Sequence, residues 1–335
     1  MKNASLQKII ALDPIEGADR IEKASVLGWQ TVVIKGAFKV GDFCVFIPVD
    51  TIVPDKPPFA FLKDKNFRIR KAKMKGCVSQ GVAMPLSDFA TELAGVEVVE
   101  GADVSEQMGV THYEKPIPYQ LAGMAKGSFP AFIKKTDEER LQNIPGILIR
   151  HLGKEFVYTE KINGTSTTFF LNEGVFGVCS RNLELTEHVD NGYWKMARKL
   201  NLEELLKKFK MDFGSDLTIQ GEMYGNGICG NHYNIKDVRF ACFNIFDITH
   251  QKHFAHDTIK DICVVNKIDM VPELGRFIMK PEMDVKYFEE LAKGRSVINK
   301  DVKREGCVFR PVIECVDPET GSCSYKMINP EHKED

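Results

Sequence analysis

The sequence predicts an α+β protein in which a small β-barrel is followed by a larger domain built on antiparallel sheets. From Leu6 to Leu86, short segments rich in β-branched and aromatic residues alternate with turns that contain Gly, Asp and Pro. After a Pro- and Gly-containing stretch with little periodicity, strand-like segments flank one long amphipathic helical stretch, Asp190–Phe209. We therefore divide the chain into a first domain, a linker and a second domain, at residues 1–113, 114–129 and 130–335.

Length and composition limit the classes of function. The 335 residues are enough for two domains with separate cores. The formal net charge of -2 gives no global basic field, so a site for a polyanion must be a local patch. No apolar run approaches the roughly 20 residues that cross a bilayer, and we expect no membrane partner. Nine cysteines without a CxxC pair or a secretion signal indicate reduced thiols, no disulfides and a cytoplasmic protein.

The first domain has the size and strand spacing of an OB-type barrel. Basic residues gather in one part of it: Lys63, Lys65, Arg68, Arg70, Lys71, Lys73 and Lys75. Because residues i and i+2 share a face of a strand, we expect Arg68 and Arg70 to point outward while Phe67 and Ile69 point to the core. Two interpretations stay open, a strand that contacts nucleic-acid phosphates and a solvated outer face.

Two further segments carry structural expectations. The sequence Glu139–Pro145 predicts a short helix that ends at the proline. His250, His253 and His256 do not converge on a helix or on a strand, so we expect a polar surface segment rather than a metal site. The amphipathic stretch has an apolar face of probable core residues: Trp194, Met196, Leu200, Leu202, Leu205 and Leu206.

The sharpest local feature is the sequence Glu160–Gly164, in which Lys161 ends one apolar strand just before another begins. A lysine followed by a turn glycine is common, and alone it indicates nothing. Five further segments follow in order, at the ends of predicted strands or within them: Ser180–Asn182, Gln220–Glu222, Phe243–Ile248, Arg304–Val308 and Ser324–Lys326. Each alone fits a salt-bridged arginine, a strand-end carboxylate or a core phenylalanine, so their order carries the signal.

Together these segments resemble the nucleotidyltransferase motifs shared by ATP-dependent RNA ligases, DNA ligases and mRNA capping enzymes. The fifth family of RNA ligases is the most similar, because in it an OB domain precedes the nucleotidyltransferase domain. Three more stretches look like that family: Pro14–Pro54, Glu139–Pro145 and Ser324–Glu331. The resemblance implies an ATP-dependent enzyme that joins 3′-OH and 5′-phosphate ends at nicks in RNA or RNA-containing duplexes, and we expect a monomer.

The resemblance also implies roles for residues around the nucleotide. Lys161 would attack the α-phosphorus of ATP and form a lysyl-AMP, with Glu160 beside it in the AMP site. Lys326 would supply positive charge that favours a neutral amine and neutralises the α-phosphate. Glu222 would accept hydrogen bonds from the ribose hydroxyls, and Phe246 would stack on adenine.

Further residues are assigned to the metal and to phosphates. Glu305 would hold Mg²⁺ or Mn²⁺, and Asn163, where many relatives have an acidic residue, would act through metal-bound water. Arg181 would contact nucleic-acid phosphate, and Arg140 the ATP phosphates. Related ligases often have a second lysine where Ser324 stands, and three residues are candidates for the missing charge: Lys303, Arg304 and Arg310.

Alternative functions share part of this pattern. DNA ligases and GTP-using capping enzymes usually carry an OB domain after the last motif, so a leading barrel favours an RNA ligase. The first domain also resembles OB domains that bind tRNA, in which case the second domain would be catalytically silent. Covalent labelling by AMP separates the enzyme from such a binding protein.

Overall fold

The computed structural model describes residues 2–114, 116–117 and 119–332, and the chain divides into two compact units. The first unit comprises Met1–Pro116 and Gln142–Pro145, and the second comprises Ile117–Leu141 and Gly146–Asp335. The predicted linker is wrong in its second half, because Ala125–Ser128 forms strand β12 and pairs with β17 (Leu183–Leu185). Of that linker, Lys115 and Pro118 lie outside the described residues.

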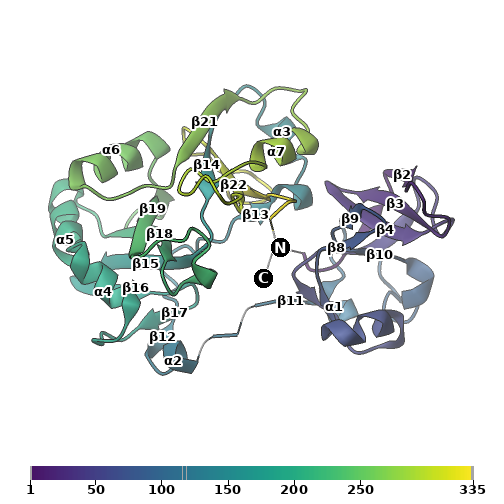
Figure 1. Ribbon diagram of the computed structural model, residues 1–335, viewed down its shortest axis with the longest axis horizontal. Helices are drawn as coiled ribbons and strands as arrows, with labels where there is room; N and C mark the ends of the chain where they lie inside the picture. Colours follow the sequence, from purple (N-terminus) through teal and green to yellow (C-terminus); the bar gives the residue numbers. More distant parts are fainter. Residues whose placement is uncertain (1, 115, 118, 333–335) are drawn as a thin grey trace. The chain divides into compact units, whose positions relative to one another are not determined.

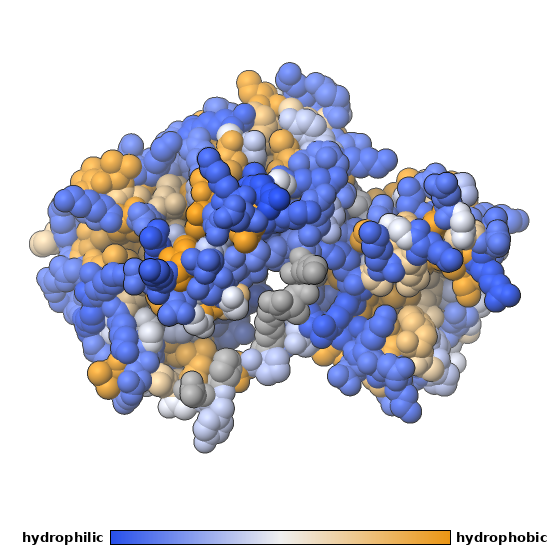
Figure 2. All heavy atoms as spheres, in the orientation of Figure 1, coloured by the Kyte–Doolittle hydropathy of each residue, from blue (hydrophilic) through white to orange (hydrophobic). Residues whose placement is uncertain are grey.

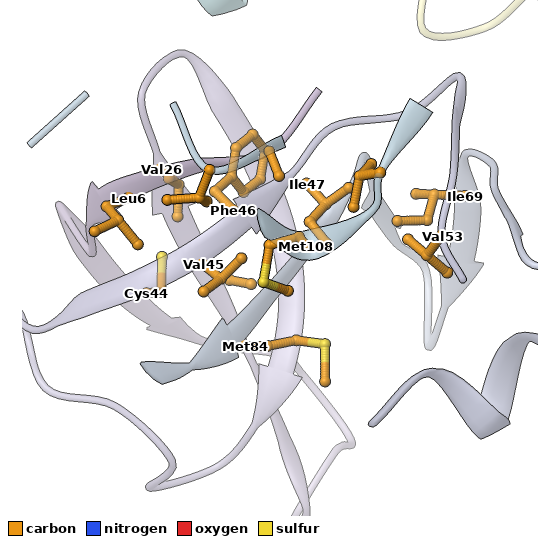
Figure 3. Packing of buried hydrophobic residues seen from close by; sticks show 14 of the residues in the cluster. Leu6, Val26, Cys44, Val45, Phe46, Ile47, Val53, Ile69, Met84 and Met108 are labelled. Atoms are coloured by element: carbon orange, nitrogen blue, oxygen red, sulfur yellow. The ribbon is translucent and has the colours of Figure 1, made fainter. Parts of the chain in front are cut away.

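Short antiparallel strands form the first unit. Three sheets and a hairpin contain them: β1 (Ser5–Lys8), β5 (Phe43–Ile47) and β10 (Val82–Pro85); β2 (Ala11–Pro14), β3 (Ile21–Val26) and β4 (Trp29–Ile34); β11 (Thr111–His112), β6 (Thr51–Ile52) and β7 (Arg68–Ile69); β8 (Ala72–Met74) and β9 (Cys77–Ser79). Three short helices complete it: η1 (Pro57–Lys65), η2 (Leu86–Phe89) and α1 (Ser105–Met108). Burial alternates along β4, as the pattern of its sequence predicts. Figure 3 shows Leu6, Val45, Phe46 and Met84 packed in the common core.

The basic region of this unit is not one strand. Lys63 and Lys65 belong to helix η1, and the positive φ angles of Asn66 and Phe67 interrupt the chain before the two-residue strand β7. The expectation that Arg68 faces outward is wrong, since only 9% of it is exposed. Its Nη2 lies 3.2 Å from Asp50 Oδ1, and its guanidinium lies 3.4 Å from the ring centre of Tyr113. Arg70 is exposed, as predicted.

A seven-stranded antiparallel sheet forms half of the second unit. Its order is β12, β17, β16 (Val175–Cys179), β15 (Thr165–Asn172), β18 (Leu217–Gly225), β19 (Val238–Asp247) and β20 (Lys252–His253). Helices α4 (Gly192–Lys199), α5 (Leu202–Phe213) and α6 (His256–Asn266) cover one face of it (Figure 1). The predicted amphipathic helix is confirmed as α4 and α5, broken at Asn201, which has a φ of 50°. Trp194, Met196, Leu202 and Leu206 are buried, and Leu200 and Leu205 are partly buried.

A five-stranded sheet forms the other half. Its order is β13 (Glu139–Arg140), β23 (Tyr325–Ile328), β22 (Gly306–Pro311), β14 (Glu155–Lys161) and β21 (Glu273–Ile278), and of its pairs β13–β23 is parallel while the others are antiparallel. Helix α7 (Val285–Ala292) packs on it through Phe288, which contacts Phe309 and Tyr325. The helix predicted to end at Pro145 is wrong, because the segment forms β13 and then the short helix η3 (Leu141–Asn143). Helix α3 (Ile147–Arg150) follows, and α2 (Tyr119–Ala122) and η4 (Cys229–Asn231) are the remaining short helices.

The three histidines do not form the expected surface segment. His250 is exposed and contacts Asp247, whereas His256 is 1% exposed and contacts Glu273. Burial, with nearby Arg310, lowers the pKa of His253 to about 3. Each histidine therefore has its own structural environment.

Among the described residues, no helix is both long enough and apolar enough to span a membrane. Figure 2 shows hydrophilic residues over most of the visible surface of each unit, with apolar side chains in small groups.

Candidate active site

Lys161 is the last residue of β14, and the neighbouring strand brings a carboxylate to it. Lys161 pairs with Gly306, and the Nζ atom of Lys161 lies 2.5 Å from Oε1 of Glu305. A Cβ atom on Gly306 would lie 2.2 Å from the carbonyl oxygen of Met327, so only glycine lets β22 and β23 approach this closely. The packing of β14, β22 and β23 thus fixes the ion pair between Lys161 and Glu305.

Gly164 similarly allows a close approach of the backbone to a strand, here β18 of the seven-stranded sheet. A Cβ atom there would lie 2.3 Å from the carbonyl oxygen of Met223 and 2.8 Å from Cγ of Glu222. Strands β15 and β18 pair Ser166 with Glu222. Between Lys161 and Gly164, the backbone N–H of Asn163 donates to the hydroxyl of Tyr233 at 2.7 Å. The loop after Lys161 is therefore held against β18, and the side chain of Glu222 enters the electrostatic field of Lys161.

Two carboxylates control the protonation of Lys161. Burial would lower the pKa of its amine, but Glu305 and Glu222 outweigh burial and raise it, while Arg140 opposes them. Burial raises the pKa of Glu222 to about 8; Lys161 opposes this shift and Glu305 adds to it. Lys161 is therefore a cation held by Glu305, and Glu222 belongs to the same group of interacting side chains.

Lys326 lies on β23 in a more positive environment. Burial lowers its pKa from 10.5 to about 8, and Arg140 and Lys161 act in the same direction. The parallel pairing of β13 with β23 sets Arg140 directly opposite Lys326. Arg181 is 56% exposed, bonds Asp137 at 2.7 Å and also adds positive field at Lys326.

The three candidates for the missing motif charge have contacts of different kinds. Lys303 forms an ion pair with Glu331 at 2.6 Å, and Nη1 of Arg310 donates to the carbonyl oxygen of Phe243 at 2.8 Å. Nη1 of Arg304 lies 4.0 Å from Sγ of Cys307. Arg140 is the residue that strand pairing sets opposite Lys326, and its positive charge lowers the pKa of Lys326.

Comparisons with known proteins agree with this arrangement. A profile of an OB-fold domain matches residues 3–86, and a profile of the RNA ligase family matches residues 154–328. The chain belongs to the RNA ligase family. No curated protein sequence matches it. The α+β fold is thus confirmed as an N-terminal OB-fold domain followed by the RNA ligase domain with its antiparallel sheets.

Solved structures of the Naegleria gruberi RNA ligase are similar over nearly the whole chain. A lysine-to-alanine variant with ATP and Mn is 32% identical, with a TM-score of 0.87 over 98% of this chain and 97% of that one. The same protein with pyrophosphate is 33% identical, with the same TM-score and coverage. Another lysine-to-alanine variant with ATP and Mn is 32% identical, with a TM-score of 0.85 over 98% of this chain and 96% of that one. The chain is therefore an enzyme of the RNA ligase family with an N-terminal OB-fold domain.

Two residues predicted to contact the nucleotide are buried in this structure. Phe246 is 1% exposed and packs with Ile133, Phe170 and Ile248, so in this structure neither face of its ring is open to adenine. Ile133, which precedes β13, forms part of this packing around Phe246. The pattern of predicted strands could not reveal that contact. Glu160 is also 1% exposed, and its Oε2 accepts a hydrogen bond from the backbone N–H of Val297 at 2.7 Å.

Sequence reasoning missed two residues of the site. Tyr233 supports the backbone of Asn163, and Asp137 pairs with Arg181. Both lie in irregular segments, outside the ordered motifs. A tyrosine and an aspartate of this kind carry no periodicity or spacing signal, so only the fold reveals them.

Proposed function

We propose that this enzyme joins 3′-OH and 5′-phosphate ends of RNA at nicks in duplexes, using ATP and a lysyl-AMP formed on Lys161. The observation that carries the proposal is the convergence of four side chains from two sheets. Lys161, Glu222 and Lys326 come from β14, β18 and β23, and Glu305 directly precedes β22. The ATP- and Mn-containing structures of the Naegleria gruberi ligase support ATP and a divalent cation as its cofactors.

In the first step, Nζ of Lys161 would bond to the α-phosphorus of ATP as the bond to the bridging oxygen breaks and pyrophosphate leaves. The attacking amine must be neutral, yet Glu305 and Glu222 hold a proton on it. Once the charge of these carboxylates is compensated, burial and Arg140 favour the neutral amine. Compensation of the charge of Glu305 thus decides whether Lys161 becomes neutral and can attack.

The donor set around Lys161 fits a hard divalent cation. The carboxylates of Glu305 and Glu222 and the amide of Asn163 offer oxygen ligands, which Mg²⁺ and Mn²⁺ prefer. Glu305 interacts with Glu222, and the pKa of Glu222 is raised to about 8. Two interacting carboxylates favour the binding of a positive ion. We assign Glu305 as a direct ligand and Asn163 as a residue that orients a water. When bound, the cation would shield phosphate charge and orient the reacting groups.

The remaining cations would bind phosphates. Lys326, opposite Arg140, would neutralise negative charge on the α-phosphate as it develops. The ATP phosphates suit Arg140, and the exposed Arg181 suits the substrate phosphate, because guanidinium groups pair with phosphate through two hydrogen bonds. Glu222 would bind the ribose hydroxyls.

The later steps use the same residues. AMP would pass from Lys161 to the 5′-phosphate of the substrate, which restores the amine and forms a 5′–5′ pyrophosphate linkage. The 3′-hydroxyl would then attack the substrate phosphorus, and AMP would leave. We propose a monomer. We also propose that it acts in a reducing compartment such as the cytoplasm, since its nine cysteines include no CxxC pair.

The test is incubation with ATP labelled at the α-phosphate, with Mg²⁺ or Mn²⁺, followed by denaturation. Label should remain on the wild type and on Lys195→Ala, which changes an exposed lysine of α4, and should be absent from Lys161→Ala. A phosphoramidate should lose its label in mild acid and keep it in alkali. Labelling from GTP rather than ATP, or labelling of the Lys161 variant, would refute the proposal.

A matched set of nicked duplexes then tests the substrate. We expect sealing when ribonucleotides lie on the 3′-OH side of the nick. Equal sealing of all-DNA nicks would contradict the RNA preference while leaving the lysyl-AMP step intact.

A further inference from the structure

A cluster of thiols and imidazole lies away from the nucleotide site, at the connection between β22 and β23. His151 follows helix α3, whereas Cys315 and Cys323 belong to the connection at residues 312–324. A ring nitrogen of His151 and the two Sγ atoms all lie within 4.8 Å of one another. His151 is 3% exposed and Cys323 1% exposed, while Cys315 is half-buried.

The hydrogen bonds of His151 identify which nitrogen is available. Its Nε2 lies 2.9 Å from Oδ2 of Asp317. Asp317 is fully buried and also accepts hydrogen bonds from Nε of Arg150 at 2.9 Å and from the backbone N–H of Thr320 at 3.1 Å. A carboxylate in this position accepts, so Nε2 carries the proton and Nδ1 of a neutral ring presents its lone pair.

Nδ1 of His151 is buried and has no hydrogen-bond partner within the described part of the chain. An unsatisfied buried polar atom is destabilising, so such an atom calls for a specific explanation. A histidine that binds a metal through one nitrogen and donates from the other to a carboxylate is a recurrent arrangement. The Asp317–His151 pair has this form.

We propose that His151, Cys315 and Cys323 bind a zinc ion as its three protein ligands. Two thiolates and one imidazole are the soft and borderline ligands that zinc prefers over magnesium. Ligand atoms on a tetrahedral zinc ion lie roughly 3.5–3.8 Å apart, given Zn–S and Zn–N distances of about 2.3 and 2.0 Å. The ligand atoms need to move by only about an ångström from their present separation to reach that geometry.

A disulfide between the two cysteines is the competing explanation, and the structure favours zinc. A disulfide would leave Nδ1 of His151 unsatisfied, whereas a metal ion satisfies all three side chains. Nζ of Lys154, 3.5 Å from Sγ of Cys315, also favours a thiolate there. The unsatisfied Nδ1 of His151 is therefore the observation that favours zinc over a disulfide.

The site would hold the strands that carry both lysines. His151 precedes β14, and Lys161 stands at the far end of that strand. Lys326 follows Cys323 by three residues on β23. The pair Phe156–Pro311 lies at the zinc end of the sheet and the pair Lys161–Gly306 at the other, so the ion would fasten the sheet opposite the nucleotide site.

The test is the zinc content of the full chain, purified under reducing conditions without chelator and washed with excess magnesium. Magnesium competes for carboxylate ligands and leaves thiolate-bound zinc in place. We expect about one zinc per chain in the wild type and in Cys77→Ser, which changes a half-buried cysteine of the first unit. Less than about a tenth of that should remain in Cys315→Ser and in Cys323→Ser.

Cobalt substitution keeps the test decisive where a variant does not fold. After removal of zinc, the wild-type chain with Co²⁺ should show the intense near-ultraviolet band of a thiolate–cobalt bond. Reduced wild type that holds no zinc and gives no such band would overturn the proposal. Full zinc in the Cys315 and Cys323 variants, or a native mass two hydrogens lower that locates a Cys315–Cys323 disulfide, would also overturn it.

Discussion

The lowered pKa of Lys326 gives a quantitative prediction about the pH dependence of lysyl-AMP formation. A pKa of about 8 leaves the amine about 90% protonated at about pH 7, but only about 10% protonated at about pH 9. If the cation is needed at the α-phosphate, its contribution to the rate falls about tenfold across this interval. Lys326→Arg keeps its charge throughout, since arginine does not lose its proton in this range.

The ratio of rate constants isolates this effect. The protonation of Lys161 changes with pH in both proteins, so it cancels from the ratio of the Lys326→Arg rate to the wild-type rate. That ratio should rise about tenfold between about pH 7 and about pH 9, whatever constant factor the substitution itself costs. The assay is the second-order rate constant for label transfer at low ATP, which reports groups of the free enzyme.

One control variant and one refuting result define the outcome. Lys195→Arg, on the exposed side of α4, should give a ratio that does not change with pH. A flat ratio for Lys326→Arg would refute the reasoning, because it would mean that Lys326 stays charged at about pH 9 or that its charge is not used.

Three further predictions concern packing and phosphate contacts. Gly164→Ala should abolish label transfer and lower the thermal midpoint, because the new Cβ meets Met223 and Glu222, whereas Gly127→Ala, with open space around it, should do neither. Phe246→Ala should lower the free energy of unfolding by about 3–5 kcal/mol in chemical denaturation, while Phe246→Leu should keep its ATP affinity. Arg70→Ala should weaken RNA binding and reduce its salt slope by about one, whereas Arg68→Ala should mainly lower the thermal midpoint.

Each of these has an outcome that contradicts it. Normal labelling by Gly164→Ala would show that β15 and β18 can separate at no cost to the site. Selective loss of ATP affinity in a stable Phe246→Leu would restore adenine stacking as the role of the ring. Equal RNA binding by wild type and Arg70→Ala would assign this basic region to a solvated surface.

The sequence predicted the long strands and the amphipathic helices well. Strands β14, β15, β18 and β22 fall on apolar segments rich in β-branched and aromatic residues, and helices α4 and α5 fall where helical spacing placed them. The order of the motifs also indicated that Lys161, Glu305 and Lys326 belong together, because each lies in or directly before a strand of one sheet.

The sequence failed where tertiary contacts decide the outcome. Arg68 lies in a two-residue strand next to Asp50 and Tyr113, so its burial depends on partners distant in sequence. The segment predicted as a helix at Glu139–Pro145 begins instead as a strand, because β23 offers it a parallel edge. The zinc-ligand candidates His151 and Cys323 are far apart in sequence, and no local motif connects them.

The parallel pairing of β13 with β23 also explains how one site keeps Lys161 protonated and lowers the pKa of Lys326. Glu305 and Glu222 keep Lys161 protonated, whereas Arg140, placed opposite Lys326 by β13, lowers the pKa of both lysines. The two lysines therefore differ because Glu305 and Glu222 outweigh burial at Lys161, whereas burial and the neighbouring cations outweigh Asp137 at Lys326. When the carboxylate charge is compensated, Lys161 loses the interactions that keep it a cation and retains those that favour the neutral amine. In the proposed mechanism, nucleophile activation therefore depends on the same charge compensation that phosphate binding requires.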